Sequence, residues 1–438
     1  MRRWLPLVLL CAACRPPPVS SGRPSVEAAR ASRRACEFVR GALAQDTVGR
    51  GSPIGDELPF DHVVLVMQEN RSFDHYFSQL SHGGVHVASN FATNPDADGK
   101  PVQRYHETRY CLKDVNHGWS GSFREFNGGK NDGFVVANDP NGSRALAYYD
   151  ETDLPWYYAL ARTFAISDAH FASVLGPTPP NRLFYWAGTS FGSTNAAAAP
   201  TVDPATGKAP VSLFDRLSDA QVSWLSYVTD VASPLMFPKM ITGDFDHFVG
   251  ISQFYEDAAK GTLPAVSVVE GQFGGGPGTE ESDEHPEGNI QVGQAFVAKV
   301  TSAVLHSPQW PRTVLIITYD EHGGFYDSVP PPKACPPDGT PPVSEPHHGF
   351  DQLGFRTPLI VVSPWSRRGY VSHEVVDHTS ITRLVETRFG LPAMSGRDAN
   401  AWPLLDLFDF ALADTSVPDL PEAVVDPAGR AQCARDFP

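Results

Sequence analysis

Short apolar runs bounded by polar residues recur along the chain. The run at residues 63–67 is too short for most helices and is typical of a strand that is buried on both faces. Similar runs predict further strands at residues 164–167, 222–228, 265–269, 314–319 and 359–363. Segments with a helical pattern lie between several of them, at residues 72–80, 181–187, 290–305 and 380–389. This alternation predicts βαβ units, a parallel sheet and an α/β fold.

Two long loop-rich regions interrupt the alternation, at residues 88–149 and 328–353. Regions of that length inside a compact domain usually cover a functional site. We therefore expect a single domain over residues 36–438, in which both regions are cap insertions around the site.

Polar side chains that suit a hard cation directly follow two of the predicted strands. Glu69 and Asn70 follow the first strand, and Asp320 and Glu321 follow the strand at residues 314–319. Open α/β sheets bind ligands just past the carboxyl ends of their strands, and carboxylate and amide oxygens coordinate hard cations. The pattern favours one shared cation site, and an ordinary polar turn after each strand is the alternative.

The N-terminus has the pattern of an export signal. Residues 1–13 combine a basic start, a short apolar stretch and small residues, and they are too few to span a bilayer. Cys14 follows directly and resembles the lipidated cysteine of bacterial lipoproteins, so a lipid anchor is expected there, with plain secretion as the alternative. Residues 14–35 predict a flexible tether. We expect an exported chain, either a cell-envelope lipoprotein or a secreted or periplasmic protein, with no transmembrane helix after cleavage.

Beyond the signal and Cys14, the chain has four cysteines: Cys36, Cys111, Cys335 and Cys433. An even number in an exported chain suggests two disulfides, and four cysteines allow three pairings. We expect Cys36 to pair with Cys433 near the chain ends, and Cys111 to pair with Cys335 across loops. A zinc site is the alternative, although none of the four cysteines lie close together in the sequence.

The charge of the chain limits its partners. The 438 residues carry 34 Lys and Arg against 50 Asp and Glu, a formal charge of −16. Loss of residues 1–13 removes Arg2 and Arg3 and no acidic residue, so the cleaved chain carries −18. Nucleic-acid binding needs clustered Lys and Arg, so no nucleic-acid partner is expected. Net charge also gives no attraction to anionic lipid, whereas a zwitterionic head group is not repelled.

Five motifs occur in sequence between residues 62 and 390: QENRSFDHYF, GPTPPNR, DEHPEG, YDEHGGFYD and DHTSITRLVETRFG. Together they resemble the bacterial phosphoesterase family of phospholipases C and related acid phosphatases, and they stand in the family's order. The resemblance implies an alkaline-phosphatase-like core with a mostly parallel sheet, helices on both faces and loop-rich cap insertions. It also implies hydrolysis of phosphate esters, with a phospholipid or a small phosphate ester as substrate.

Thr178 lies in a stiff proline-rich loop, which without the resemblance would be an ordinary turn with a capping threonine. The resemblance implies that Thr178 is a nucleophile that becomes transiently phosphorylated. It also implies one divalent metal ion, with ligands Glu69, Asn70, Thr178, Asp320 and Glu321. Oxygen ligands without cysteine suit a hard or borderline ion, and the sequence leaves its identity open.

The resemblance further implies roles for several histidines. His285 and His117 match family positions that bind phosphate oxygens or protonate the leaving group. Asp246 and His247 stand where relatives have an Asp-His pair, so they are also expected at the site. A structural role is the alternative for each of these histidines.

Asn181 and Arg182 are expected to contact the substrate. Asn181 lies at the start of a predicted helix, where backbone amide groups favour anions. The planar fork of Arg182 suits a phosphate group, and holding the loop through a nearby carboxylate is the alternative.

The threonine of the GPTPPNR motif resembles the phospholipase branch of the family more than the serine of acid phosphatases. An exported phospholipase C acting on phospholipid head-group diesters is therefore the expected function. An acid phosphatase acting on phosphomonoesters is the close alternative, and a non-catalytic surface lipoprotein is a distant one. Ser78 and Ser328 depart from the family's usual Gly and His, but neither is a proposed ligand.

Overall fold

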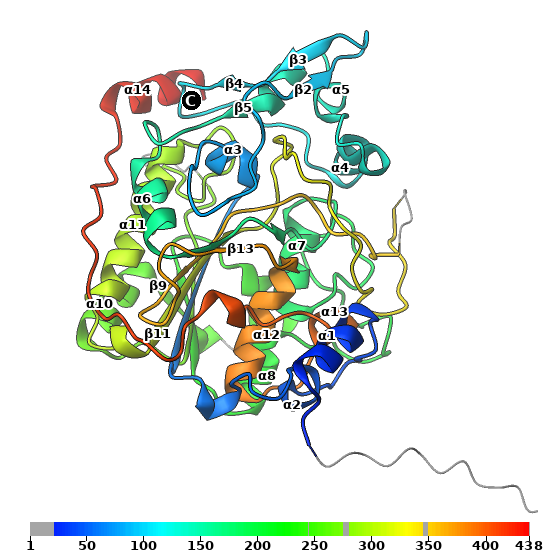
Figure 1. Ribbon diagram of the computed structural model, residues 1–438, viewed down its shortest axis with the longest axis vertical. Helices are drawn as coiled ribbons and strands as arrows, with labels where there is room; N and C mark the ends of the chain where they lie inside the picture. Colours follow the sequence, from blue (N-terminus) through cyan, green and yellow to red (C-terminus); the bar gives the residue numbers. More distant parts are fainter. Residues whose placement is uncertain (1–21, 244, 275–279, 345–348, 438) are drawn as a thin grey trace, which may run out of the picture.

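The fold is described from a computed structural model that covers residues 22–243, 245–274, 280–344 and 349–437. Within these residues, eight strands form one sheet in the order β13–β6–β12–β11–β1–β10–β8–β9 (Figure 1). Their bounds are β13 Val371–Ser372, β6 Ala165–Ser167, β12 Leu359–Val362, β11 Thr313–Tyr319, β1 His62–Gln68, β10 Val266–Val269, β8 Trp224–Val228 and β9 Phe248–Gly250. Strand β12 is antiparallel to both of its neighbours, and every other pairing in the sheet is parallel.

Strand β1 lies in the middle of the sheet, between β10 and β11. Its side chains alternate between two apolar cores. Val63, Leu65 and Met67 join one core, and Val64 and Val66 join the other. Both faces of the strand are covered, which explains its unbroken apolar run. The predicted α/β fold with a mostly parallel sheet is confirmed.

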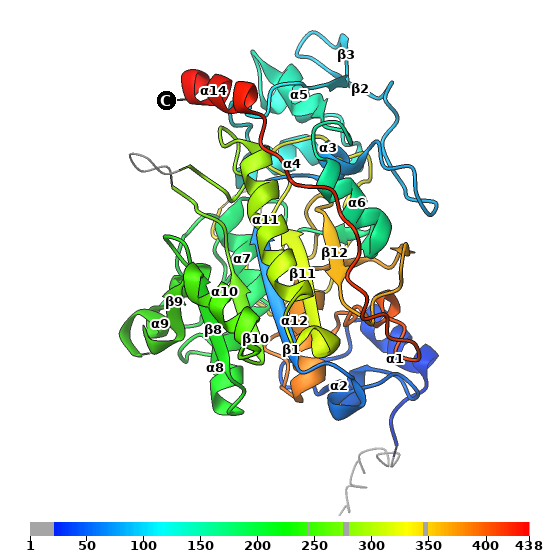
Figure 2. The same cartoon turned by 90° about the vertical axis from the view of Figure 1, so that its left-hand side faces the viewer.

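Helices cover both faces of the sheet (Figure 2). The core on the Val63 face includes residues of α7 (Thr178–Ala187), α8 (Leu213–Asp219) and α12 (His378–Phe389). The core on the Val64 face includes residues of α3 (Phe73–Phe77), α6 (Pro155–Thr163), α10 (Ile251–Lys260) and α11 (Ile290–Leu305). Helix α3 is shorter than predicted, and α7 begins earlier than predicted, at Thr178.

Residues 88–149 form a layer above the sheet, at the top of Figure 1. It consists of β2 (Thr93–Pro95), β3 (Pro101–Gln103), β4 (Tyr105–His106), β5 (Ala147–Tyr148), α4 (Trp119–Phe126) and α5 (Phe134–Ala137). Its small apolar core includes Phe134, Leu146 and Phe325. Phe325 belongs to the motif after β11, so this core fixes the layer, here called the cap, to the carboxyl edge of the sheet.

The N-terminal segment corrects one prediction. The expected flexible tether over residues 14–35 is wrong for Val26–Arg34, which form helix α1. Ala29 and Arg33 of this helix are buried against the domain. Alanine and arginine favour a helix, and packing of one face stabilises it. The predicted export signal and Cys14 lie outside the described residues.

The disulfide pairing also differs from the prediction. Cys36 pairs with Cys335 and Cys111 pairs with Cys433, with Cα–Cα distances of 5.5 and 5.7 Å. The expected pairs Cys36–Cys433 and Cys111–Cys335 are therefore wrong. The path of the chain gives the reason: α1 lies at the lower right of Figure 1, whereas the C-terminal helix α14 (Pro427–Asp436) lies beside the cap at the upper left.

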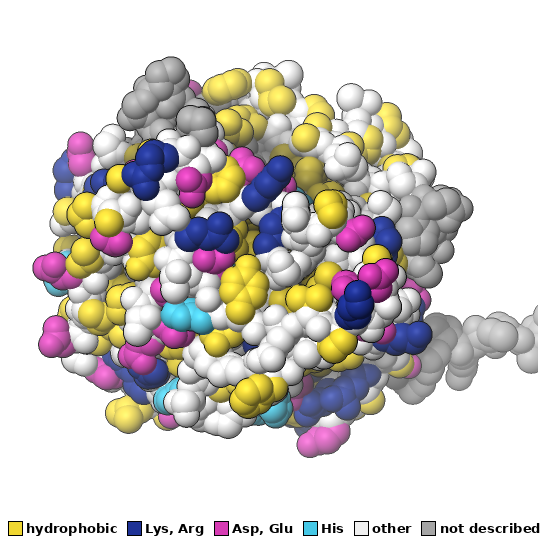
Figure 3. Space-filling view, turned by 90° about the horizontal axis from the view of Figure 1, so that it is seen from above, with side chains coloured by type: hydrophobic (Ala, Val, Ile, Leu, Met, Phe, Trp, Pro, Cys, Tyr) yellow, Lys and Arg dark blue, Asp and Glu magenta, His cyan; other side chains and the backbone are white. Residues whose placement is uncertain are grey.

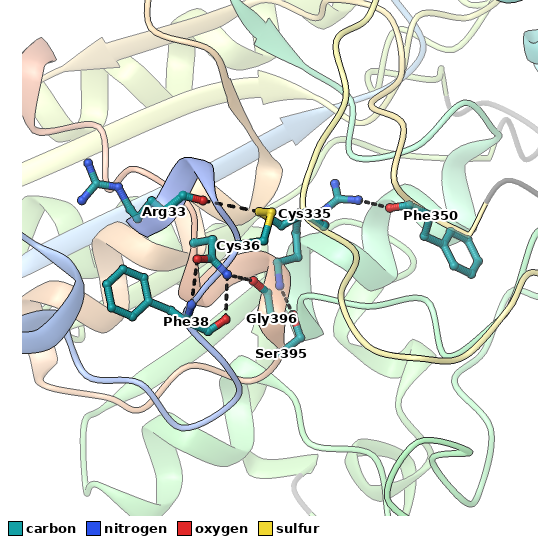
Figure 4. The surroundings of a disulfide bond; sticks show 9 residues. Arg33, Cys36, Phe38, Cys335, Phe350, Ser395 and Gly396 are labelled. Atoms are coloured by element: carbon teal, nitrogen blue, oxygen red, sulfur yellow. Dashed lines mark hydrogen bonds between the residues drawn. A yellow bond between two sulfur atoms is a disulfide. The ribbon is translucent and has the colours of Figure 1, made fainter. Parts of the chain in front are cut away.

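Figure 4 shows the Cys36–Cys335 bond, which joins the segment after α1 to the insertion at residues 328–353. Beside it, the Phe38 N–H donates to Asn400 Oδ1 over 3.1 Å. The N-terminal segment is thus attached to the domain both covalently and by hydrogen bonds.

The remaining α-helices and strands of the described chain are short. They are α2 (Ala44–Thr47), α9 (Pro238–Gly243), α13 (Gly396–Ala399) and the paired strands β7 (His170–Phe171) and β14 (Val376–Asp377). Among the described helices, none has the length and apolar character needed to cross a bilayer.

Candidate active site

Strands β1 and β11 end side by side, because their last residues are paired in the parallel ladder. Glu69 and Asn70 follow one strand, and Asp320 and Glu321 follow the other. The backbone N–H groups of Asn70 and Glu321 both donate to Asp320 Oδ1, over 3.1 and 2.7 Å. All four side chains are buried. The two strand ends that the sequence singles out are therefore in direct contact.

This contact depends on unusual backbone conformations. Asn70 has a φ of +61°, in the left-handed region that Asn tolerates better than most residues. Gly323 has a φ of +65°, and a Cβ atom there would lie 2.2 Å from the Asn70 carbonyl oxygen. The glycine lets the chain after β11 close onto the chain after β1.

Thr178 is the first residue of α7 and lies beside these strand ends. Its Oγ1 lies 3.4 Å from Asn70 Oδ1, and its side chain is partly exposed. Pro177 precedes it and Pro179 and Pro180 follow it, so the local backbone is restricted. The structure thus places a hydroxyl group next to the buried carboxylates. We call Glu69, Asn70, Thr178, Asp320 and Glu321 the cation corner.

Asn181 holds the loop that carries Thr178. Its Nδ2 donates to the carbonyl oxygens of Gly176 and Pro177, over 2.9 and 3.1 Å. Its Oδ1 accepts from the Val174 N–H over 3.0 Å. The amide is buried and engaged at both atoms, so it holds this loop in place, and the expected contact of Asn181 with substrate stays a prediction.

Arg182 is held by three carboxylates. Its Nη2 donates to Glu69 Oε1 and its Nε to Asp320 Oδ2, each over 3.1 Å, and its Nη1 donates to Glu270. The side chain is 2% exposed. Of the two roles that the sequence allows, the structure shows the one in which the fork holds carboxylates. Glu270 directly follows β10, and the pattern of an apolar run that ends in an acid would have revealed it.

The buried groups of this region carry more negative than positive charge. Among the described side chains, the Arg182 guanidinium acts on four carboxyl groups, those of Glu69, Glu270, Asp283 and Asp320. A fifth carboxyl group, that of Glu321, acts on Glu69 and Asp320. Burial, followed by the charge of Asp320, raises the pKa of Glu69 well above its ordinary value. Burial also raises the pKa of Asp283 to about 7. Both shifts show that these carboxylates have too little compensating charge.

Two carboxylate oxygens here are buried without a hydrogen-bond partner, Glu321 Oε1 and Asp283 Oδ2. A buried polar atom without a partner destabilises the fold unless a cation satisfies it. Carboxylate, amide and hydroxyl oxygens are the ligands that hard divalent cations take. The cation corner therefore fits a divalent metal ion.

Two of the predicted histidines lie at this corner. His117 comes from the cap, and its Nε2 lies 3.3 Å from Asn70 Nδ2. The His285 ring lies edge-on to the His117 ring, with centroids 5.7 Å apart. Burial lowers the pKa of His117, but the carboxylates of Glu321 and Asp114 outweigh it and raise the pKa to about 10. Asp114 Oδ1 lies 3.4 Å from His117 Nδ1 and was not evident from the sequence.

Asp246 and His247 lie elsewhere, which corrects their predicted place at the site. His247 stacks on Trp224, with ring centroids 3.9 Å apart, and its Nδ1 lies 2.8 Å from the Trp224 carbonyl oxygen. Trp224 begins β8 and is level with the start of β1, whereas the cation corner follows the end of β1. At about 3.3 Å per strand residue, the two positions are separated by roughly the length of strand β1.

The two strand ends lie within a region that matches a known family. A model of the Phosphoesterase family matches residues 60–392. The chain belongs to the phosphoesterase family. Phospholipase C B of Mycobacterium tuberculosis is 33% identical to this phosphoesterase over 437 residues, which cover 85% of this chain and 82% of that protein.

Other similar proteins come from different sources. Hemolytic phospholipase C of Pseudomonas aeruginosa is 33% identical and covers 88% of this chain and 60% of its own length. Non-specific phospholipase C6 of Arabidopsis thaliana is 31% identical, and the match covers 82% of this chain and 74% of that protein. Among solved structures, a protein in the alkaline phosphatase superfamily from Vibrio parahaemolyticus aligns with 85% of this chain and 77% of its own, with a TM-score of 0.40 and 12% identity.

In this phosphoesterase, Glu284 fixes the loop that carries Asp283 and His285. Glu284 has a φ of +73° and a buried carboxylate. Three tyrosine hydroxyls donate to that carboxylate over 2.6, 2.5 and 2.8 Å, those of Tyr76, Tyr157 and Tyr319. Burial raises the pKa of Glu284, although these hydrogen bonds lower it. The tyrosines come from separate parts of the chain, so no local sequence pattern indicates this cage.

A buried histidine connects the cap to the cation corner. His322 Nδ1 lies 3.1 Å from Glu321 Oε2, and its Nε2 lies 2.8 Å from Glu125 Oε2. Glu125 belongs to α4 of the cap. Burial lowers the pKa of His322, but Glu125 and Glu321 together raise it to about 9. His322 is thus held as a cation between two carboxylates and orients one of the candidate metal ligands.

The surface on the cap side of the phosphoesterase, seen from above in Figure 3, carries both basic and acidic side chains. Lys and Arg side chains lie between Asp and Glu side chains, and hydrophobic side chains are scattered among them. On the visible and described part of this face, basic groups are dispersed and do not form one patch.

Proposed function

We propose that this phosphoesterase is a phospholipase C that hydrolyses phospholipid head-group diesters through a phospho-threonine intermediate. The observation that carries the proposal is the contact between Thr178 and the strand ends, where Oγ1 lies 3.4 Å from Asn70 Oδ1. Family membership and the similarity to three proteins named phospholipase C support it.

One divalent ion would be held by oxygens of Glu69, Asn70, Thr178, Asp320 and Glu321. When bound, such an ion supplies charge that lowers the pKa of a coordinated hydroxyl and offsets the charge on phosphate oxygens. Arg182 keeps the Glu69 and Asp320 carboxylates oriented through its fork. Held in this way, the two side chains need little reorganisation when substrate arrives.

In the first step, Thr178 Oγ attacks phosphorus in line with the bond to the glycerol oxygen. The Oγ–P bond forms, the bond from phosphorus to the glycerol oxygen breaks, and that oxygen takes a proton to leave as diacylglycerol. In the second step, water attacks phosphorus and the P–Oγ bond breaks. Thr178 Oγ regains a proton, and the phosphorylated head group leaves.

The proton transfers fall to the two histidines beside the corner. The rings of His117 and His285 lie next to each other in a T-shaped arrangement, and neither residue belongs to the sheet. The Nδ1 atoms lie 2.7 Å from the Val115 carbonyl oxygen and 2.9 Å from the Pro286 carbonyl oxygen. These contacts hold Nδ1 as the donor, so each Nε2 is the atom that exchanges a proton with the reacting oxygens.

A substrate comparison separates the diester from the monoester function. A monoester dianion needs more positive charge in its pocket than a diester monoanion, and the guanidinium of Arg182 beside the cation corner is already paired with three carboxylates. We expect p-nitrophenyl phosphorylcholine to be hydrolysed with a kcat/KM at least about 10-fold above that of p-nitrophenyl phosphate, about 1.4 kcal/mol in transition-state binding. The reverse order would assign the chain to acid phosphatase chemistry.

Substitution of the nucleophile tests the mechanism. Thr178→Ala removes the attacking oxygen, so kcat/KM falls by about 1,000-fold or more. Thr178→Ser keeps a hydroxyl at the same position and retains most of that activity. We expect mass spectrometry of rapidly quenched wild-type enzyme to show the phosphorylated head group, still esterified, on the peptide with Thr178. An active Thr178→Ala enzyme would overturn the assignment.

We also place this phosphoesterase outside the cytoplasm. The signal pattern of residues 1–13 supports export, and so do the two disulfides, because such bonds persist in oxidising compartments. Attachment through a lipid on Cys14 and release as a free protein give different masses for the mature N-terminal peptide, which mass spectrometry distinguishes.

A further inference from the structure

His86, Asp168 and His373 form a cluster apart from the cation corner. His373 Nδ1 lies 2.8 Å from Asp168 Oδ1 and 3.0 Å from Oδ2, and His86 Nδ1 lies 3.3 Å from Oδ2. The three ligand-type atoms all lie within 4.8 Å of one another. The two rings flank the carboxylate, with centroids 4.7 Å apart.

The sheet places two members of this cluster next to each other. Strands β6 and β13 are parallel neighbours, and Ser167 is paired with Ser372 at their ends. Asp168 and His373 are the next residues of each strand, so they leave the sheet together. His86 comes from the loop after α3 and approaches the same carboxylate.

The carboxylate is fixed before any ligand binds. The Asp168 side chain is 0% exposed, and its Oδ2 accepts from the His86 backbone N–H over 2.7 Å. The Asp168 carbonyl oxygen accepts from Arg356 Nη1 over 2.9 Å. The two imidazoles are 68% and 46% exposed, so solvent reaches the cluster from the side of the histidines.

The spacing suits a transition-metal ion. In a tetrahedral zinc site, bonds of about 2.0–2.2 Å place neighbouring ligand atoms about 3.4 Å apart. The nitrogen–oxygen distances of 2.8 to 3.3 Å are slightly shorter, and the exposed imidazoles have room to open by that amount. We propose that His86, Asp168 and His373 bind one transition-metal ion of the Zn²⁺ class.

This site is distinct from the cation corner in both place and chemistry. Two strands, β12 and β11, separate β6 from β1, and three strand spacings of about 4.8 Å amount to roughly 14 Å. The cluster offers two nitrogens and one carboxylate, which favour zinc, copper or nickel over magnesium or calcium. The cation corner offers oxygens. The site therefore does not depend on the proposed function.

The bound ion would join three segments of the chain. The loop after α3, the end of β6 and the end of β13 already meet through the β6–β13 pairing, through His82 Nε2, which lies 2.8 Å from the Gly369 carbonyl oxygen, and through the shared carboxylate. Strand β13 is at the edge of the sheet and is paired with β6 over two residues. We expect Zn²⁺ to hold this edge in place and to raise the temperature of unfolding.

Zinc titration of the full chain tests the site. His86→Ala and His373→Ala each remove one ligand from an exposed position, so both variants are expected to fold. His306→Ala is the control, because His306 is exposed and belongs to none of the metal-type clusters in the described chain. By isothermal titration calorimetry, we expect His86→Ala and His373→Ala each to bind one Zn²⁺ equivalent fewer than the control. Equal stoichiometry and affinity in all three proteins would overturn the proposal.

A second measurement uses the wild-type chain. Diethyl pyrocarbonate modifies exposed imidazoles, and peptide mass spectrometry reports each histidine separately. We expect Zn²⁺ to slow the modification of His86 and His373 by about 10-fold or more, while His306 reacts at an unchanged rate. If His86 and His373 react as fast with Zn²⁺ as without it, the cluster is a hydrogen-bonded triad that binds no metal.

Discussion

Arg182 Nε lies 3.1 Å from Asp320 Oδ2, and both side chains are buried in the region where the candidate nucleophile lies. The same guanidinium also binds Glu69 and Glu270. The single guanidinium of Arg182 therefore orders the carboxylates that follow three different strands of the sheet.

Loss of Arg182 is expected to destabilise the whole domain. Arg182→Ala leaves three buried carboxylates without their partner, which typically costs about 3–5 kcal/mol when a buried ion pair is broken. Chemical denaturation measures the difference. The matched control is Arg162→Ala, which removes the partly exposed pair with Glu151 and costs less than about 1 kcal/mol. A similar loss in both variants would contradict this account of Arg182.

Glu321 gives a direct test of the cation corner. Glu321→Gln replaces a carboxylate oxygen by an amide nitrogen at nearly constant volume, so the ligand set loses one charge and one oxygen donor. We expect bound divalent metal, measured by elemental analysis, to fall at least about 10-fold, and phosphodiesterase activity to fall with it. Glu256→Gln changes an exposed carboxylate paired with Lys260 and serves as the control. Unchanged metal content in Glu321→Gln would remove Glu321 from the ligand set.

The sequence predicted the parts of this site that depend on local pattern. Apolar runs that end in acids located Glu69 and Asp320, because a strand buried on both faces must be apolar and must stop where polar groups begin. The same reasoning located the sheet and its two helical layers. Family motifs then singled out Thr178 and His285, which local pattern alone left as a turn and a lone histidine.

The parts that the sequence did not predict depend on contacts between distant segments. Disulfide pairing depends on where the chain ends lie, and the chain places Cys433 beside the cap. The partner of Arg182 and the tyrosines around Glu284 come from separate elements, so neither leaves a periodic trace. For His247 the local sequence was misleading: the Asp246-His247 pair matched a site motif, but His247 lies at the opposite end of the strands from the cation corner.

The three tyrosines around Glu284 are expected to affect catalysis indirectly, because they hold the loop that carries His285. Glu284→Gln turns an acceptor of three hydroxyl donors into a group with its own N–H donors, and hydrogen bonds to a charged group are worth about 1.5–3 kcal/mol each. The loop with His285 should then lose its fixed position. We expect kcat to fall by more than KM changes, together with a loss of stability.

Tyr157→Phe is the graded control for the cage. It removes one hydroxyl donor and leaves the carboxylate in place, so kcat and stability should fall less than in Glu284→Gln. Steady-state kinetics at matched fractions of folded enzyme separate the two effects. If Glu284→Gln keeps the wild-type kcat in its folded fraction, the cage stabilises the fold without orienting His285.

The stability of the fold is expected to depend on pH through Asp327. Arg356 is bound by Asp74 and Asp327, over 2.9 and 2.8 Å, and all three side chains are 0% exposed. One guanidinium therefore faces two carboxylates. Burial raises the pKa of Asp327 to about 6, Arg356 opposes the shift, and Asp74 adds to it. The unfolded chain binds this proton only below its ordinary pKa of 3.8.

The sign of the pH effect follows from proton binding. Between pH 4 and pH 6 the folded chain holds a proton on Asp327 that the unfolded chain has lost, so the contribution of Asp327 to stability falls as pH rises through this window and is constant above it. A shift of about two pKa units corresponds to roughly 3 kcal/mol. Asp327→Asn removes the titration and should flatten the curve of unfolding free energy against pH, measured by urea denaturation at fixed divalent metal. Asp98→Asn, at an exposed position, should leave the curve as in the wild type, and a wild-type slope in Asp327→Asn would show that other groups carry the pH dependence.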